Sequence, residues 1–397
     1  MQDFAQLGIP DQLKENIAKE RFHTPTPIQK QSIPLALEGR DILGISQTGS
    51  GKTAAFAIPM LAHLLTNSKG HALILTPTRE LATQVFAHVK RLLGKSSRIG
   101  MALLIGGASY HQQMQQLKRH PRLVIATPGR TVDHMERGTL KLNEISFFVL
   151  DEMDRMLDAG FKNELNKISQ AFNDSAQTLL FSATTTPKVR EQAIKFLTDP
   201  AVVELKDPLK AKANLKSEVV KVKSLEKYDH LLGELQARNG SIILFMKTKA
   251  QTDQMAERLR RASVEAQAIH GDLPQGKRDR IIRNFRQQNF QVLVATDVAA
   301  RGLDIPHVEH VINYELPHAV YDYTHRIGRT ARAGRSGSVL TIITKADTAK
   351  WAVIERMLQG ESVEDLPPAK RKKGGYKKQN KRYFSKPRPK KHSKKNS

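Results

Sequence analysis

Cysteine is absent from the 397 residues, which excludes disulfide bonds and thiolate metal sites and fits a reducing compartment. Long apolar runs are also absent, so no segment of the sequence predicts a membrane span. The first twenty residues lack the basic start and the apolar run of a secretory signal. From these absences we expect a cytoplasmic protein without a membrane partner.

Acidic residues are scarce relative to basic ones. The chain carries 39 Asp and Glu against 64 Lys and Arg, which gives a net charge of +25 and a pI of 10.1. The imbalance peaks in residues 370–397, which hold 14 Lys and Arg and no acid. Such a charge predicts a polyanionic partner, and a segment with no apolar face to bury should be disordered when alone.

Short apolar runs alternate with helical stretches twice along the chain. Because these runs are rich in Leu and β-branched residues throughout, they predict strands buried on both faces, as in a parallel sheet. We therefore expect an α/β fold with one sheet in each half of the chain. The runs occupy residues 72–76, 122–127, 147–151, 178–184, 241–245, 267–271, 292–297, 310–315 and 338–344.

Residues 46–53, SQTGSGKT, predict a loop that binds nucleotide phosphates. The glycines let backbone amides approach phosphate oxygens, Lys52 neutralises charge, and Thr53 ligates Mg²⁺. Ser46 departs from the pattern, which usually has glycine or alanine at this position. The residues expected to hold ATP and Mg²⁺ here are Thr48, Gly49, Ser50, Gly51, Lys52 and Thr53.

Three carboxylates end an apolar run at FFVLDEMD, residues 147–154. Taken alone they could mark a solvated helix start, since acids suit a helix N-terminus. In a chain that also has a phosphate loop, a carboxylate at the end of a neighbouring strand can hold Mg²⁺ and orient the attacking water. We assign Asp151 to the metal ion, together with Thr53, and Glu152 to the activation of water.

These motifs and their order resemble the DEAD-box family of ATP-dependent RNA helicases over about residues 4–344. The resemblance implies two RecA-like domains joined by a flexible linker, with ATP and RNA bound between them. It places the domains at residues 1–204 and 218–366, the linker at 205–217 and a disordered basic tail at 367–397. The tail is similar to those of bacterial members of the RhlE type. It lacks a folded RNA-recognition module, so we expect no single dedicated RNA target.

The resemblance also assigns residues to ATP outside the phosphate loop. FHTPTPIQ (22–29) is similar to the Q motif, in which an aromatic ring stacks on adenine and a glutamine reads its edge. HRIGRTARAGR (325–335) is similar to the motif that supplies arginine fingers to the γ-phosphate. The residues so implied are Phe4, Phe22 and Gln29 for the base, Asp304 for the ribose, and Arg326 and Arg329 as fingers.

Further motifs resemble the coupling and RNA-binding segments of the family. Asp154, Ser182, Thr184 and His325 would couple hydrolysis to strand separation, with both hydroxyl groups bonded to Asp154. Threonine hydroxyls, helix-start amides and arginines suit RNA phosphates. The RNA-binding residues so implied are Pro77, Thr78, Arg79, Gly106, Gly107, Thr127, Pro128, Gly129, Arg130, Thr248, Gly271, Gln275, Arg278 and Thr296.

Two further positions depart from the family pattern. Met153 replaces the alanine of Asp-Glu-Ala-Asp, and Ala331 replaces a glycine. Because side chains alternate along an extended segment, we expect Met153 to turn away from the metal and into the apolar layer. Ala331 would be strained if its φ were positive.

The resemblance predicts an RNA-stimulated ATPase that locally unwinds short RNA duplexes or remodels RNA–protein complexes. An ATP-timed RNA clamp or annealing chaperone and a DNA translocase of the same superfamily are the alternatives, and reading of 2′-hydroxyls would separate RNA from DNA. Ribosomal precursor particles and RNA-decay machinery are candidate partners besides RNA. We expect the tail to tether RNA through its cations and aromatic rings, with a solubilising role as the alternative.

Overall fold

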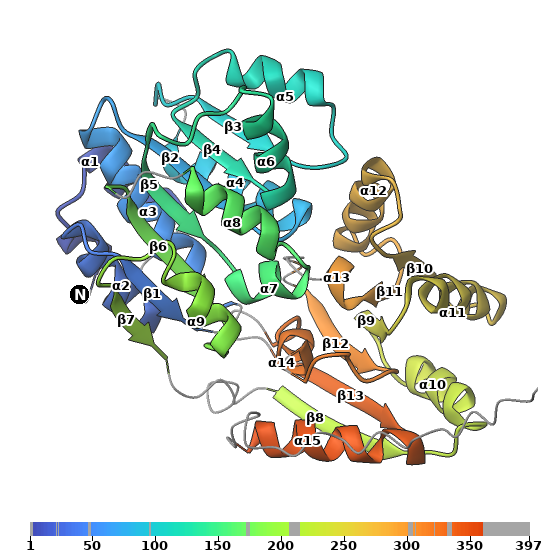
Figure 1. Cartoon of the computed structure of the whole chain (residues 1–397). Helices are drawn as coiled ribbons and strands as arrows, with labels where there is room; N and C mark the ends of the chain where they lie inside the picture. The colour runs from blue at the N-terminus through green and yellow to red at the C-terminus, as the bar shows by residue number, and fades with distance from the viewer. Residues whose placement is uncertain are drawn as a thin grey trace, which may run out of the picture.

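The computed structural model contains two α/β domains, one from each half of the chain, and each has a parallel sheet flanked by helices (Figure 1). It describes residues 3–20, 22, 24–46, 49–94, 97–171, 175–205, 215–300, 305, 307–320, 322–331 and 336–359. Thr48, Asp304, most of the predicted linker and the predicted tail lie outside the described residues.

The first domain is built on a parallel sheet with the strand order β3-β4-β2-β5-β6-β1-β7. Side chains alternate between its faces: in β2, Ala72 and Ile74 join one apolar cluster, while Leu73 and Leu75 join the other. Both faces are therefore buried, as the continuous apolar runs predicted. The strands are β1 (Ile42–Ile45), β2 (His71–Leu75), β3 (Met101–Leu104), β4 (Leu123–Ala126), β5 (Ile145–Leu150), β6 (Gln177–Ser182) and β7 (Ala201–Glu204).

Helices cover both faces of this sheet. One apolar cluster takes residues from α1 to α4, among them Phe56 and Val85, and the other takes residues from α6 to α9, among them Met153 and Leu165. The helical elements are η1 (Phe4–Gln6), α1 (Asp11–Lys19), α2 (Pro27–Leu37), α3 (Lys52–Thr66), α4 (Arg79–Leu93), α5 (Tyr110–Leu117), α6 (Pro128–Glu136), α7 (Met153–Asp158), α8 (Lys162–Gln170) and α9 (Pro187–Ala193).

The second domain repeats this plan with the strand order β10-β11-β9-β12-β13-β8. In β9, Ile243 and Phe245 pack with α12, α14 and α15, whereas Ile242 and Leu244 pack with α10 and α11. The elements are β8 (Leu215–Lys221), α10 (Lys227–Gln236), β9 (Ser241–Met246), α11 (Lys249–Arg261), β10 (Ala266–Ile269), α12 (Gln275–Arg286), β11 (Val292–Thr296), α13 (Asp297–Ala300), β12 (Val308–Asn313), α14 (Asp322–Ile327), β13 (Gly337–Ile343), η2 (Lys345–Asp347) and α15 (Thr348–Leu358).

The structure confirms the nine predicted strands and adds β1, β3, β7 and β8. β8 corrects the predicted linker at 205–217, because its first residues, 215–217, pair with β13.

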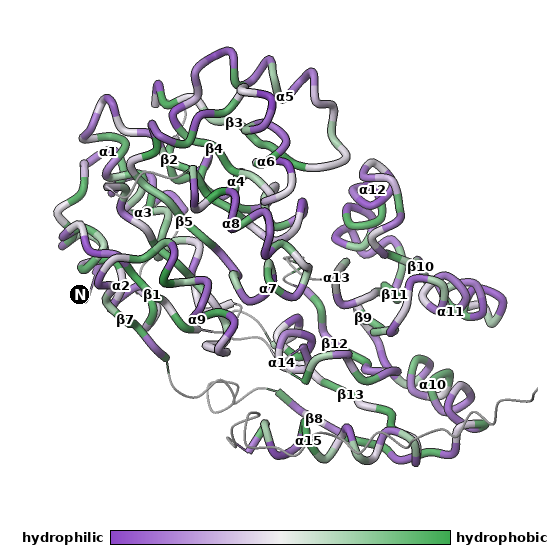
Figure 2. Tube along the Cα trace, viewed as in Figure 1, coloured by the Kyte–Doolittle hydropathy of each residue, from purple (hydrophilic) through white to green (hydrophobic). Residues whose placement is uncertain are grey.

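Hydrophilic residues dominate the outer helix α11 (Figure 2). None of the helices in the described residues combines the length and the apolar character that crossing a bilayer requires.

Candidate nucleotide and RNA site

The motif residues gather at the carboxyl ends of the strands, because the strands of each sheet run in one direction. In the first sheet, the predicted nucleotide and coupling residues follow the neighbouring strands β5, β6 and β1, and the predicted RNA residues follow β3, β4 and β2. In the second sheet, Thr248, Gly271 and Thr296 lie at the ends of β9, β10 and β11. The predicted nucleotide residues and the predicted RNA residues therefore occupy different parts of the seam between the domains, which we call the nucleotide half and the RNA half.

The loop between β1 and α3 is a preformed phosphate cradle. Gly49 and Gly51 have φ values of 83° and 95°, in the left-handed region that favours glycine. Ser46 fits without a positive φ: its hydroxyl pairs with Ser50 Oγ at 2.9 Å, and its carbonyl accepts a bond from Lys52 Nζ at 2.7 Å. α3 starts at Lys52, so its unpaired first amides adjoin the loop.

The Q motif supports this loop directly. Gln29 Nε2 donates to Gly51 O at 2.9 Å, and Gln29 Oε1 accepts from Thr26 N at 2.9 Å. The amide keeps one donor and one lone pair for a base. Phe4 is only 3% exposed, and its ring lies 6.2 Å from that of the partly buried Phe22. The assignment of Phe4 to the base is therefore corrected, because Phe4 packs behind Phe22 in the core.

Asp151 meets the requirements of a metal ligand. Its side chain is buried, and its Oδ1 accepts no hydrogen bond in the part of the chain that is described. Burial and, after it, the neighbouring Glu152 carboxylate raise the pKa of Asp151 to about 7, although Lys52 opposes this rise. The described residues contain no group of three His, Asp or Glu able to hold a metal, so phosphates and water would complete a Mg²⁺ shell.

Glu152 occupies an unusual backbone conformation for its residue type. Its φ is 55° and its ψ is 53°, and α7 begins immediately afterwards. A left-handed conformation costs a non-glycine residue on the order of 1 kcal/mol or more, and such residues cluster at functional sites. The turn sends Met153 into the apolar cluster under the sheet, where it is fully buried. The predicted burial of Met153 is confirmed, although a turn into a helix causes it and not alternation along an extended segment.

Asp154 contacts one of the two hydroxyl groups assigned to it. Thr184 Oγ1 donates to Asp154 Oδ2 at 3.5 Å. Ser182 Oγ donates instead to Thr184 O at 2.8 Å, so the assignment of the Ser182 hydroxyl to Asp154 is corrected. Ser182 shapes the turn that presents Thr184, and Thr184 makes the contact.

In the RNA half, a glycine pair makes room for Arg79. Thr78 caps α4 by accepting from Leu81 N at 3.2 Å, and Arg79 is the first residue of that helix. A Cβ on Gly106 would lie 3.2 Å from Arg79 Nη2, and one on Gly107 would overlap the guanidinium. Gly107 also has a φ of 74°. The pair lets the guanidinium lie against the backbone at the seam.

A tyrosine that the sequence motifs did not identify supports Arg130. The ring of Tyr110 stacks on His134 at 4.4 Å, and the guanidinium carbons of Arg137 and Arg130 lie 4.3 and 5.6 Å from its centroid. Arg130 lies in the first turn of α6; its Nε lies 3.6 Å from Asp133 Oδ2 and has no hydrogen-bond partner among the described residues. The position of an aromatic residue three places after the glycine pair was the available signal for Tyr110.

Gln275 and Arg278, for which the sequence predicted an RNA contact, contact the first domain in this structure. Gln275 Nε2 donates to Glu80 Oε1 at 3.2 Å, and Arg278 Nη2 lies 2.9 Å from Glu80 Oε2. Glu80 belongs to the first domain and is buried together with Arg278. These residues hold the two domains against each other at the RNA half of the seam. Sequence spacing could not reveal this contact, because the partners are 195 residues apart.

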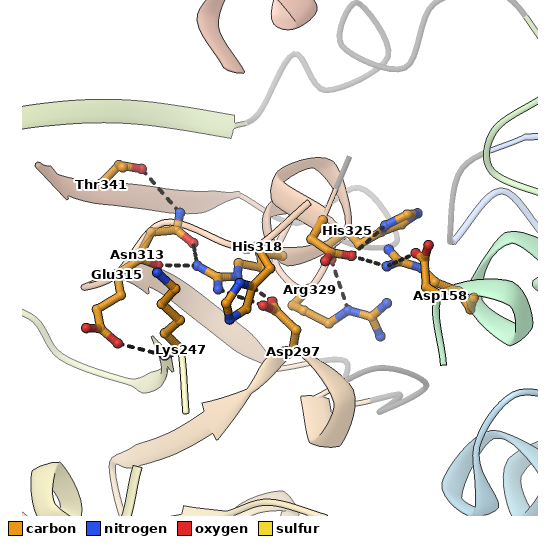
Figure 3. A network of polar contacts seen from close by, with 12 residues as sticks. Asp158, Lys247, Asp297, Asn313, Glu315, His318, His325, Arg329 and Thr341 are labelled. Atoms are coloured by element: carbon orange, nitrogen blue, oxygen red, sulfur yellow. Dashed lines mark hydrogen bonds and ion pairs between the residues drawn. The ribbon is translucent and has the colours of Figure 1, made fainter. Parts of the chain in front are cut away.

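The structure also corrects the assignment of Arg326 as an arginine finger. Its Nε and Nη2 donate to the Asp297 carboxylate at 2.5 and 2.9 Å, and its Nη1 donates to Asn313 Oδ1 at 3.1 Å and to Glu315 O at 2.5 Å. Its side chain is 1% exposed and lies over the Phe245 ring. All three nitrogens are thus used inside the second domain, and Figure 3 labels Asp297, Asn313 and Glu315, the residues that accept these bonds.

Arg329 and His325 lie at the side of this network that faces the first domain. Arg329 Nε donates to His325 O at 3.2 Å, and both residues line a pocket with Asp297 and Asp322. Figure 3 shows His325 and Arg329 facing Asp158 of the first domain. Ala331 follows with a φ of 53°, so the strain anticipated for an alanine at this position is present.

The fold and the site define a class: a two-domain nucleotide-binding protein whose domains share one seam. Residues 26–192 match the DEAD/DEAH box helicase family, and residues 223–334 match the helicase conserved C-terminal domain. An "ATP-dependent RNA helicase CshA" from Limosilactobacillus reuteri is 40% identical over 92% of this chain and 74% of its own length. The chain belongs to the DEAD/DEAH box helicase family.

The domain arrangement of this chain can be compared with two structures of one yeast protein in different complexes. Saccharomyces cerevisiae Dbp5 bound to RNA and ADP BeF3 matches with a TM-score of 0.82 at 31% identity, covering 91% of this chain and 95% of that one. A Dbp5 variant bound to Nup159, Gle1, IP6 and ADP matches with 0.61 at 30% identity, covering 89% and 92%. The two domains here are RecA-like, and their arrangement is closer to that of the RNA-bound structure.

Proposed function

We propose that the chain is an ATP-dependent RNA helicase, which hydrolyses ATP when RNA is bound and locally unwinds short duplexes. The observation that carries the proposal is the division of the seam. The phosphate cradle and Asp151 lie in one half, Arg79 and Arg130 lie in the other, and Glu80 ties the two domains together.

We further propose a role for each group in the nucleotide half. Lys52 and the backbone of Gly49 to Gly51 bind phosphates, and Asp151 with Thr53 would hold Mg²⁺, which would neutralise phosphate charge. Glu152 orients and deprotonates the attacking water, since a carboxylate need only be positioned within hydrogen-bond reach of it. Arg329 remains the proposed finger, and Asp154, Thr184 and His325 remain the proposed coupling group.

The experiment compares steady-state ATPase turnover of the full chain and of Glu152→Gln at one fixed salt concentration. Each is measured without nucleic acid, with single-stranded RNA and with DNA of matched sequence. Glu144→Gln is the control, because Glu144 is an exposed glutamate of the same domain. We expect strong stimulation by RNA alone in the wild type and the control, and its loss in Glu152→Gln.

Other results would favour the alternatives. Equal stimulation by DNA would indicate a DNA translocase of the same superfamily. Tight RNA binding without turnover in any condition would indicate a clamp or annealing chaperone. We also propose a cytoplasmic location, an RhlE-like subtype, and action on ribosomal precursor particles or RNA-decay machinery.

The basic tail is proposed as an RNA tether. Its 14 Lys and Arg can neutralise phosphates, and its rings can stack on bases. Deletion of residues 368–397 is expected to weaken RNA binding and to flatten its salt dependence while ATPase turnover at saturating RNA stays nearly constant. An unchanged salt dependence would leave only a solubilising role.

A further inference from the structure

Arg155 is a buried cation that none of the roles above uses. It follows the Asp-Glu-Met-Asp motif as a residue of α7, and only 2% of its side chain is exposed. Its Nη1 donates to Oδ1 of Asp322, the first residue of α14 in the second domain, whose side chain is 5% exposed. Asp158 is a more distant partner, at 3.8 Å and on the same helix.

The electrostatics make this cation depend on the other domain. Burial lowers the pKa of Arg155, but the carboxylates of Asp322, Asp154 and Glu152 outweigh it and raise the pKa overall. Arg155 Nη2 has no hydrogen-bond partner within the described ranges, so Nη1 carries the close contacts. If Asp322 were absent, closure would bury this cation without its partner in the second domain, and the first-domain carboxylates Asp158, Asp154 and Glu152 would compensate its charge only in part.

The pair also touches both coupling segments. The backbone amide of Arg155 donates to Asp154 Oδ1 at 3.0 Å. On the other side, His325 Nδ1 lies 3.9 Å from Asp322 Oδ1, and both residues line the pocket shared with Arg329. The contact therefore connects the carboxylate that bonds Thr184 to the histidine of the second domain.

We infer that Arg155 and Asp322 are positioning residues for domain closure, which form an ion pair across the seam and align Asp154 with His325. The two residues belong to different domains, so opening of the seam separates them and returns both charges to water. The pair lies beside the nucleotide half, whereas the Glu80 contact lies at the RNA half. The inference rests on the proposed RNA-stimulated ATPase activity.

The test is a double-mutant cycle in the full chain with Arg155→Met, Asp322→Asn and the double variant. Removing one partner leaves a buried group uncompensated, so each single variant should lower RNA-stimulated turnover about a hundredfold. The double variant should turn over ATP no more slowly than either single variant, because it has neither charge of the pair and so buries no unpaired one. Closure itself is measured by energy transfer between dyes on Glu144→Cys and Glu355→Cys, which the cysteine-free chain allows.

We expect transfer on addition of RNA and a non-hydrolysable ATP analogue to fall in both single variants and to recover in the double variant. Lys227→Met is the matched control, because Lys227 is a mostly buried cation whose partner Asp347 lies in the same domain. Melting temperatures of all variants identify a simple loss of folding. The inference would be overturned if each single variant lowered RNA-stimulated turnover less than threefold, or if the two reductions multiplied in the double variant. A wild type that RNA does not stimulate would instead refute the proposed function.

Discussion

Replacing Gly107 by alanine should displace Arg79 and weaken RNA binding without touching the nucleotide half. The new Cβ would overlap the Arg79 guanidinium, whereas at Gly106 it would lie 3.2 Å from Nη2. The φ of 74° at Gly107 adds backbone strain that an alanine cannot relieve. The substitution thus acts through packing on Arg79, the arginine proposed to bind an RNA phosphate.

The expected size follows from the contact that is lost. A charge-assisted hydrogen bond contributes roughly 1.5–3 kcal/mol, so the dissociation constant for RNA should rise by about 10- to 100-fold. The slope of log affinity against log salt for single-stranded RNA should flatten by about 0.7, the loss of one phosphate contact. Binding of ATP should be unchanged, because Gly107 follows β3 at the far side of the sheet from the phosphate loop.

Another glycine provides the control for the assay, which is fluorescence anisotropy of labelled RNA over a salt series. Gly138→Ala carries the same kind of strain, with a φ of 67°, but its Cβ would meet nothing within 4 Å. If Gly107→Ala binds RNA as Gly138→Ala does, with the same salt slope, the role assigned to Arg79 is refuted.

Three further predictions concern stability. Ala331→Gly should raise the melting temperature of the second domain by relieving about 1 kcal/mol of strain at its φ of 53°, and no rise would show that the turn tolerates alanine. Met153→Ala should destabilise the first domain by about 3 kcal/mol, because it leaves a cavity, and should change the turnover of the folded protein less than tenfold. Unchanged stability with a tenfold or larger change in turnover would place Met153 in catalysis. Burial, together with Arg130, lowers the pKa of His134 to about 4 from an ordinary 6.5. The neutral imidazole therefore contributes its full stabilisation of the folded state above pH 6.5, and this stabilisation is lost as the pH falls towards 4. Chemical denaturation of wild type and His134→Gln across this range should show a flatter pH dependence in the variant.

The strands that the sequence predicted correctly are those with both faces buried. β2, β5 and β9 are nearly continuous apolar runs, and such runs have few alternatives to a central strand. The edge strands β7 and β8 escaped prediction because burial alternates along β7 and most of β8 is exposed. Their strand conformation is imposed by pairing with a neighbour, which leaves little trace in composition.

The local structure of the site segments agrees with expectation where a motif forms its own turn or helix start. The phosphate loop and the helix starts at Thr78 and Thr127 need only turns and amides that adjacent residues supply. The predicted contacts of Arg326 and Ser182 were wrong, and the contact of Gln275 with Glu80 was not predicted, because each residue finds its partner in a segment or a turn that spacing does not reveal. A cation such as Arg326 can equally serve a ligand or a buried carboxylate, and only tertiary packing decides which.

The division of each sheet edge into two halves has a thermodynamic consequence. On the site assignments proposed above, a nucleotide would bridge the seam at the side of β1, β5 and β6, and an RNA strand would bridge it at the side of β2, β3 and β4. The binding free energy of the first ligand is reduced by the whole free energy of bringing the two sheets together, whereas the second ligand binds to sheets that are already apposed. By linkage, any factor by which RNA tightens the binding of ATP must equal the factor by which ATP tightens the binding of RNA.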